Sequence, residues 1–245
     1  MHNGIHYEAL LVVLSYVISV LGSYTALQLA IAIPQARDRS AALGWVIGAA
    51  TALGGGAIWS MHFIAMNAAD MGMPVSYDAT LTFASLLMGI AASAIGLYVV
   101  GRGEGSTSKL LVSGVVTGLG VALMHYTGME AVLMPAKIVY DPALFYGSLV
   151  IAVVAATVAL WLAFNLRGNL QRFGSALVMG VAVCGMHYTG MYAVRMTPAE
   201  EPAATGISLP PATLGQSVFI VSAVVLVLLL AFSAWKSQRS VMADL

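Results

Sequence analysis

The chain has 245 residues, of which 60% are hydrophobic and 8% are Asp, Glu, Lys or Arg. Soluble domains carry about 25% charged residues, so this chain has too few charges to cover a water-soluble globule. Its net charge of zero gives no support to a nucleic-acid partner, which needs a basic face, and its single cysteine excludes an intrachain disulfide. The composition predicts a protein embedded in a lipid bilayer.

Seven apolar runs follow one another along the chain, each long enough to cross about 30 Å of hydrocarbon as a helix. We place them at residues 10–33, 41–66, 79–100, 110–134, 143–166, 173–196 and 214–235. Backbone groups in lipid must be hydrogen-bonded within the segment, so the predicted fold is an all-α bundle of seven spans in a single domain. The first run lacks the preceding basic residues of a cleavable signal peptide and is expected to be a retained span.

The basic residues indicate how this bundle is oriented. Eight of the ten fall in connections on one side of the predicted membrane: Arg37, Arg39, Arg102, Lys109, Arg167, Arg172, Lys236 and Arg239. Only Lys137 and Arg195 fall on the other side. The positive-inside rule therefore predicts an outside N-terminus and a cytoplasmic C-terminus. The longest connection, residues 195–213, is proline-rich and is expected to lie over the outer face.

A Met-His dipeptide recurs in the second, fourth and sixth predicted spans, at His62, His125 and His187. Each histidine follows a glycine by seven residues and precedes a methionine by four. These residues are Gly55, Gly118 and Gly180, and Met66, Met129 and Met191. Seven residues make about two helical turns, so glycine and histidine share a face. We expect the glycines to let neighbouring backbones approach closely and to bring the histidine faces together.

A fainter pattern marks the first, third and fifth spans, where a tyrosine and an acid precede the helix and a serine follows eight residues after the tyrosine. The sets are Tyr7, Glu8 and Ser15; Tyr77, Asp78 and Ser85; and Tyr140, Asp141 and Ser148. The repeat unit is thus a helix pair used three times, with the seventh span left over, in a pseudo-threefold arrangement. The acids are expected to cap helices or, alternatively, to accept the outer ring proton of a metal-bound histidine.

Three histidines in register inside a membrane predict a functional site, because buried histidine is costly in lipid. Imidazole suits copper, zinc, iron or nickel, and added thioether donors favour copper, Cu(I) in particular. The candidate ligands, for one or two copper ions, are His62, His125, His187, Met66, Met129, Met191, Met61, Met124 and Met186. Cys184, one turn before His187, is either a further donor or an apolar filler.

Other functions of three histidines remain open. They could hold zinc in a lipid hydrolase, although no carboxylate shares their helix faces. A copper oxidase and a copper transport protein are further alternatives, although deep donors below the histidines are limited to Gln28 and Cys184. A haem held by two histidines fits three equivalent ones poorly.

The three motifs resemble those of the bacterial MHYT integral membrane sensor domain, and the resemblance covers essentially the whole chain. It implies a copper site that senses oxygen, carbon monoxide or nitric oxide in the cytoplasmic membrane. The residues that carry over are Met61, His62, Met124, His125, Tyr126, Met186, His187 and Tyr188. The first motif departs from the pattern, with Phe63 and Ile64 in place of tyrosine and threonine. Larger members join this domain to a signalling enzyme or a DNA-binding domain. Here only about ten residues follow the last span, so we expect the chain to signal through a separate partner, to be a fragment of a larger sensor, or to have another function.

Overall fold

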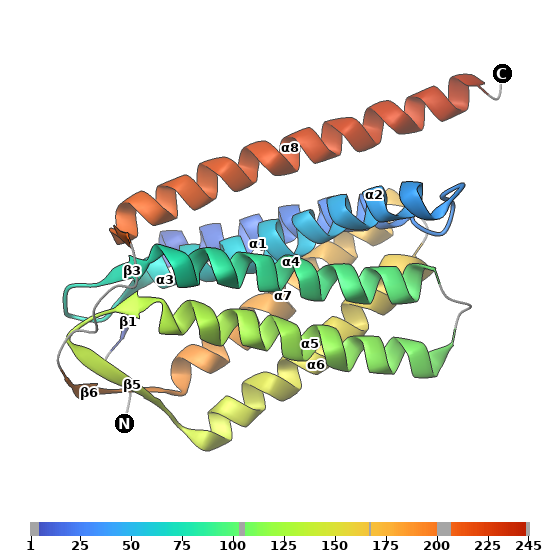
Figure 1. Cartoon of the computed structure of the whole chain (residues 1–245). Coiled ribbons are helices and arrows are strands. Elements are labelled where there is room, and N and C mark those ends of the chain that lie inside the picture. Colours follow the sequence, from blue (N-terminus) through green and yellow to red (C-terminus); the bar gives the residue numbers. More distant parts are fainter. Residues whose placement is uncertain (1–4, 103–105, 167, 200–206, 244–245) are drawn as a thin grey trace.

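The computed structural model describes residues 5–102, 106–166, 168–199 and 207–243. Its helices are α1 (Ala9–Ala30), α2 (Arg39–Ala50), η1 (Thr51–Trp59), α3 (Ser60–Ala68), α4 (Ala79–Gly101), α5 (Thr107–Glu130), α6 (Pro142–Asn165), α7 (Asn169–Tyr192) and α8 (Pro211–Ala243). The segments α2, η1 and α3 form one continuous rod of 30 residues. The described residues thus form seven helical rods, as predicted, and the all-α fold is confirmed (Figure 1).

Six of these rods are long and apolar enough to cross a membrane: α1, the α2–α3 rod, α4, α5, α6 and α8. The chain is therefore a multi-pass membrane protein. Helix α7 has a sufficient length of 24 residues but does not belong to this apolar set. Its first turns are polar, and Arg172 donates hydrogen bonds to Gln28 of α1 and to Asn169. Because α7 packs between α1 and α6, its polar start is bonded within the bundle.

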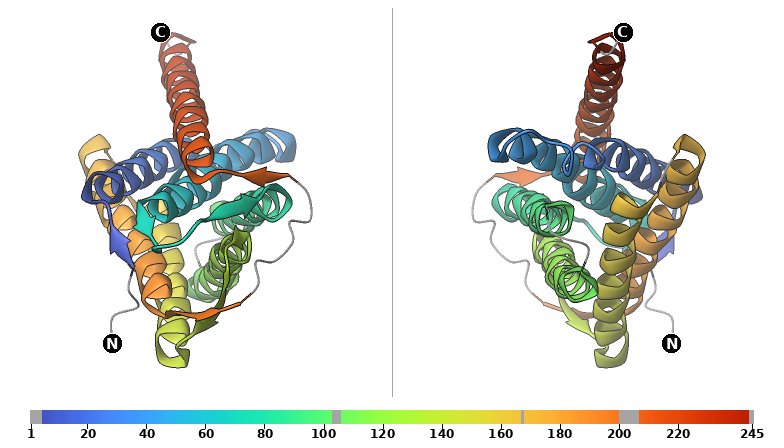
Figure 2. Two further views of the ribbon diagram at one scale, coloured as in Figure 1. Left: turned by 90° about the vertical axis from the view of Figure 1, so that its left-hand side faces the viewer. Right: turned by 90° about the vertical axis from the view of Figure 1, so that its right-hand side faces the viewer.

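Six rods form a ring in which each contacts the next, in the order α1, η1–α3, α4, α5, α6, α7 and back to α1. Helix α8 lies outside this ring, against α1 and α3, and diverges from the bundle toward its C-terminus (Figure 2). Only 11% of its most apolar stretch is buried. The leftover helix is thus the last one, as the repeat pattern predicted.

Short strands, which were not predicted, join the helices at the end of the bundle that carries the N-terminus (Figure 1). They pair β1 (His6–Tyr7) with β2 (Ala69–Asp70), β3 (Ser76–Asp78) with both β4 (Val132–Leu133) and β7 (Ser208–Leu209), and β5 (Ala136–Tyr140) with β6 (Val194–Pro198). The predicted spans 110–134 and 173–196 therefore extend too far. Their last residues bond to a neighbouring strand rather than to the preceding helical turn, and the second half of connection 195–213 continues in β7.

The second rod contains a π-helix over Thr51–Trp59, with three successive glycines at its centre. A π-helix closes hydrogen bonds over five residues instead of four and is often found at functional sites. Here it ends at Ser60, whose backbone N–H and side-chain hydroxyl both donate to the carbonyl of Gly55. His62 follows two residues later, so the π-helix sets the direction in which this histidine points.

The predicted glycine contacts hold at one of three positions. A Cβ atom on Gly118 would lie 2.5 Å from the Cα of Val153, so α5 and α6 do approach backbone to backbone. In the second rod, Gly54 rather than Gly55 makes such an approach, to Gly89 of α4, because the π-helix shifts the register. Gly180 instead faces side chains of α1.

Candidate metal centre

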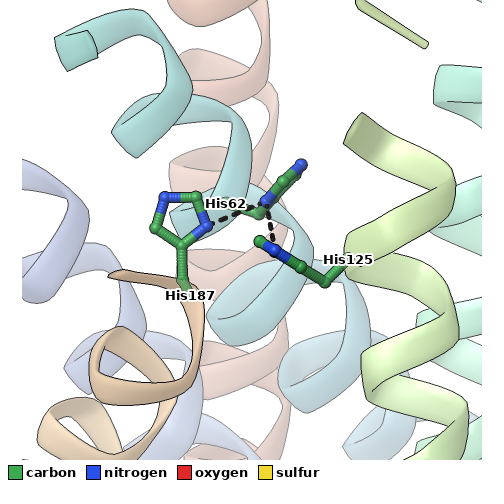
Figure 3. Close-up of side chains that lie close together, drawn as sticks. All are labelled: His62, His125 and His187. Atoms are coloured by element: carbon green, nitrogen blue, oxygen red, sulfur yellow. Dashed lines mark hydrogen bonds between the residues drawn. The ribbon is translucent and has the colours of Figure 1, made fainter. Parts of the chain in front are cut away.

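The three motif histidines converge at one point from α3, α5 and α7 (Figure 3). The Nδ1 atom of His62 lies 3.0 Å from that of His187 and 3.1 Å from that of His125. One ring nitrogen from each lies within 4.8 Å of the others. At most 1% of any of these side chains is exposed. The structure thus assembles the buried triad that the spacing of 63 and 62 residues predicted.

The geometry of the triad fits a metal ion. Two nitrogens that bind one tetrahedral ion at about 2.0–2.1 Å are separated by about 3.3 Å, close to the two distances around His62. A hydrogen bond between two ring nitrogens needs one N–H and one lone pair, and Nδ1 of His62 faces two partners at once. A cation would instead accept a lone pair from each of the three nitrogens, so the donor set suits one.

The outer ring nitrogens, Nε2, of all three histidines are buried without a hydrogen-bond partner among the described residues. Two of these nitrogens lie against a glycine of the next motif. Each of these glycines follows its own motif histidine by three residues. A Cβ atom on Gly128 would collide with Nε2 of His62, and one on Gly190 would lie 2.6 Å from Nε2 of His125. These glycines therefore make room for the rings, a role that was not predicted from the sequence although both glycines stand in the repeated motif.

The predicted methionine donors are all buried, with at most 2% of any side chain exposed, and belong to the hydrophobic core around the bundle centre. Met124 packs against Gly89 of α4, and Met186 lines an apolar cavity. Buried methionine is ordinary packing material as well as a soft donor, so direct ligation by these residues stays a prediction.

Two of the three predicted acids, Asp78 and Asp141, cap helices. The carboxylate of Asp78 accepts from two backbone N–H groups at the start of α4, and that of Asp141 does the same for α6. Asp141 also pairs with Arg195 at 3.6 Å. Glu8 precedes α1 without a side-chain cap bond. Nε2 of each histidine has no hydrogen-bond partner among the described residues, so the alternative in which these acids accept the outer ring protons of a metal-bound triad stays a prediction.

Cys184 stands apart from the histidine cluster, because the group of close histidine, cysteine and acidic side chains contains the triad alone among the described residues. It is partly buried and lies beside Ser15 of α1. Its position therefore favours the apolar-filler interpretation over that of a thiolate donor.

An aromatic side chain in or near each motif forms a hydrogen bond with the serine of a neighbouring helix, which is α1, α4 or α6. The hydroxyl of Tyr126 lies 2.6 Å from that of Ser148, and the hydroxyl of Tyr188 lies 3.4 Å from that of Ser15. The first motif has Phe63, which cannot donate, and here the indole N–H of Trp59 donates to Ser85 at 3.0 Å. The tyrosine–serine pattern was visible in the sequence, but the partners of the serines were not.

The motif aromatics also pack edge-on against the tyrosines that precede the odd-numbered spans. The pairs are Phe63 with Tyr77, Tyr126 with Tyr140, and Tyr188 with Tyr7, with ring centroids 5.1–5.7 Å apart. Burial raises the pKa of the phenols of Tyr7, Tyr77 and Tyr140, which keeps these side chains neutral. The third pair joins α7 to the start of the chain, so α1 completes the threefold ring in space.

Comparison with known protein families identifies the three repeats. The family model MHYT, described as a bacterial signalling protein N terminal repeat, matches residues 55–113, 118–176 and 180–243. Each match begins at the glycine that lies seven residues before a motif histidine. By sequence the third match runs from α7 into α8, whereas in space α1 takes the corresponding place beside α7.

Three relatives are signalling proteins. The chain is 41% identical over 237 residues, 95% of its length, to the bifunctional diguanylate cyclase/cyclic di-GMP phosphodiesterase MucR of Pseudomonas aeruginosa. It is 33% identical to the signaling protein YkoW of Bacillus subtilis over 90% of its length, and 34% identical to the cyclic di-GMP phosphodiesterase NbdA of P. aeruginosa over 80%. The chain spans 34%, 28% and 26% of these proteins, respectively. No solved structure matches it.

Proposed function

The chain belongs to the MHYT family of bacterial signalling proteins, and we propose that it is a copper-binding sensor module of the cytoplasmic membrane. The observation that carries this proposal is the convergence of three buried Nδ1 atoms from His62, His125 and His187. Three imidazoles whose outer nitrogens have no hydrogen-bond partner among the described residues are costly to bury, and the free energy of binding a cation at the inner nitrogens would offset that cost.

Copper is favoured over zinc by the surroundings of the triad. The cluster contains no carboxylate among the described residues, and Asp78 and Asp141 are engaged at helix starts. A zinc hydrolase would need such a group to polarise water or substrate. The buried core around the triad instead holds six motif methionines, whose thioethers are soft donors suited to Cu(I).

The burial of the triad favours a small, uncharged ligand. Copper(I) bound here would supply an open coordination position for oxygen, carbon monoxide or nitric oxide. These molecules dissolve in lipid, whereas a charged solute would have to shed its water to reach side chains that are at most 1% exposed. The protein would hold the three imidazoles in place and exclude water from the metal.

The output of the module is proposed from its relatives. Two of them are named for making or degrading cyclic di-GMP, so we propose that the state of the copper site controls cyclic-di-nucleotide turnover through a cytoplasmic partner or output domain. The orientation expected from the basic residues, with the C-terminus inside, would bring α8 to that side. Reporter fusions at the two ends of the chain test this orientation.

The first experiment measures metal. The protein is purified in detergent without affinity metals, and its copper, zinc and iron are quantified by mass spectrometry before and after incubation with Cu(I). Alanine variants of His62, His125 and His187 should each lose most of the copper. His6→Ala is the matched control, because His6 is exposed in β1. Full copper in all three triad variants would refute the site, zinc alone would favour the hydrolase, and iron with a Soret band would favour haem.

A further inference from the structure

A small apolar cavity lies inside the bundle, walled by α5, α6, α7 and η1. Its volume is about 40 Å³. It is distinct from a larger cleft of about 360 Å³ at the end of the helices away from the strands. Lys109 and Trp161 are among the residues that line this cleft. The small cavity contains none of the histidines, and no feature of the sequence pointed to it.

The cavity lies one helical turn from the triad on all three histidine helices. Ile58, Val121 and Val183 line it, and each precedes a motif histidine by four residues. Residues four apart on a helix lie on the same face, one turn along the axis. Met186, which directly precedes His187, also lines the cavity. A molecule in this cavity is therefore next to the triad, on the side away from the strand-bearing end.

The lining selects an apolar occupant. Its only polar side chain is Thr117, whose hydroxyl already donates to the carbonyl of Ala92 at 3.3 Å. A buried water needs two to four polar partners, and apolar cavities of proteins stay dry while binding apolar guests such as xenon. The space exceeds the roughly 10–15 Å³ that one water requires, so it can accept a diatomic molecule or a xenon atom.

The wall of the cavity on the lipid side is thin. Ala155, Ala156 and Ala159 of α6 line it and are only partly buried, as is Ala182 of α7. Helix α6 is largely exposed along the bundle, with 28% of its most apolar stretch buried. Small side chains at a lipid-facing wall leave a short distance between the acyl chains and the cavity.

We propose that this cavity is a docking site for an apolar diatomic gas, which enters from the bilayer between α6 and α7 and passes to the histidine triad. The proposal rests on the proposed function, because the triad is the destination of the gas. It adds to that function a second binding site, with its own residues, that needs no metal.

Xenon tests the docking site without copper. Xenon binding to the metal-free protein in lipid nanodiscs is measured by ¹²⁹Xe NMR for wild type and three variants. Ala156→Leu should fill the cavity and abolish saturable binding, and Val121→Ala should enlarge it and strengthen binding. Ala143→Leu is the matched control, because it makes the same change on an exposed position of α6 outside the cavity. It should bind xenon as wild type does.

The outcomes separate the two proposals. No saturable xenon in wild type, or unchanged xenon binding in Ala156→Leu, would overturn the docking site even if copper binds at full occupancy. Saturable xenon that Ala156→Leu removes would support it even if the triad stays metal-free, in which case the copper proposal alone fails. With Cu(I) loaded, Ala156→Leu should also slow carbon monoxide rebinding after flash photolysis, whereas Ala143→Leu should not.

Discussion

The hydroxyl of Ser60 lies 2.5 Å from that of Ser222, deep in the contact between α3 and α8. Ser60 ends the π-helix and stands two residues before His62, so this bond links the triad to the one helix that lies outside the ring. The contact is reinforced one turn along α8, where Leu226 packs against Gly56. Movement of His62 on ligand binding would therefore reach α8 through Ser60.

Loss of that bond should loosen α8 without emptying the triad. Ser222→Ala removes one buried hydrogen bond, so we expect a loss of about 1 kcal/mol in stability and faster hydrogen exchange in α8. Copper content should stay at the wild-type level. Ser217→Ala, on an exposed position of α8, serves as control. Unchanged exchange in Ser222→Ala would show that the Ser60–Ser222 bond does not hold α8.

Copper binding should be sensitive to substitution of the glycines beside the histidine rings as well as of the ligands themselves. In Gly190→Ala the new methyl group would lie 2.6 Å from Nε2 of His125 and would push the ring out of the cluster. We expect copper affinity to fall by at least about tenfold, the range seen when groups that orient metal ligands are changed. Gly185→Ala, on the same helix with nothing within 4 Å of its added Cβ, should bind normally. Equal affinities would mean that the ring position does not matter.

Metal binding should stabilise the fold through mass action. A metal that binds only the folded protein, present at 100 times its dissociation constant, adds about 2.7 kcal/mol. Copper should therefore raise the thermal midpoint of the wild-type protein, and a chelator should reverse the effect. His125→Ala should show no rise. A similar rise in that variant would place the copper elsewhere.

Copper occupancy should fall steeply as the pH is lowered. An imidazole nitrogen binds a metal only through a free lone pair, so copper competes with protons at each of the three histidines. Protonation of any one ring removes a ligand and weakens the hold on the other two rings. Copper occupancy followed against pH should fall with a slope greater than that of a single-proton titration. A slope of one proton or less would argue against ligation by all three rings.

Sequence spacing was enough to predict the triad, because intervals of 63 and 62 residues each cover one helix pair and so place the three histidines at similar depth on three helices that run in the same direction. It could not reveal the π-helix, since Gly54, Gly55 and Gly56 carry no side-chain signal for a five-residue hydrogen-bond period. The strand pairs were hidden inside apolar runs, because Val132 and Leu133 are as hydrophobic as the helix before them. The closure of the ring by α1 also required coordinates, since Tyr7 and Tyr188 are far apart in the chain.

The first motif offers a test of the threefold pattern itself. Its Phe63 cannot bond to Ser85, and Trp59, one turn earlier, donates instead. The equivalent residues of the other motifs are small, Ala122 and Cys184, and there the motif tyrosine makes the bond. Trp59→Phe alone should therefore destabilise the protein by about 1 kcal/mol, because the buried Ser85 loses a donor.

Restoring the tyrosine should compensate. In Trp59→Ala with Phe63→Tyr, the new phenol takes the place that Tyr126 holds against Ser148, and the small residue clears the space that the indole filled. In the wild type, Trp59 still bonds to Ser85, so Phe63→Tyr should add little stability there. In the Trp59→Ala background, we expect the same Phe63→Tyr change to add more. A double-mutant cycle of unfolding free energies measures this coupling. Additive effects within about 0.5 kcal/mol would mean that the two residues do not substitute for one another at Ser85.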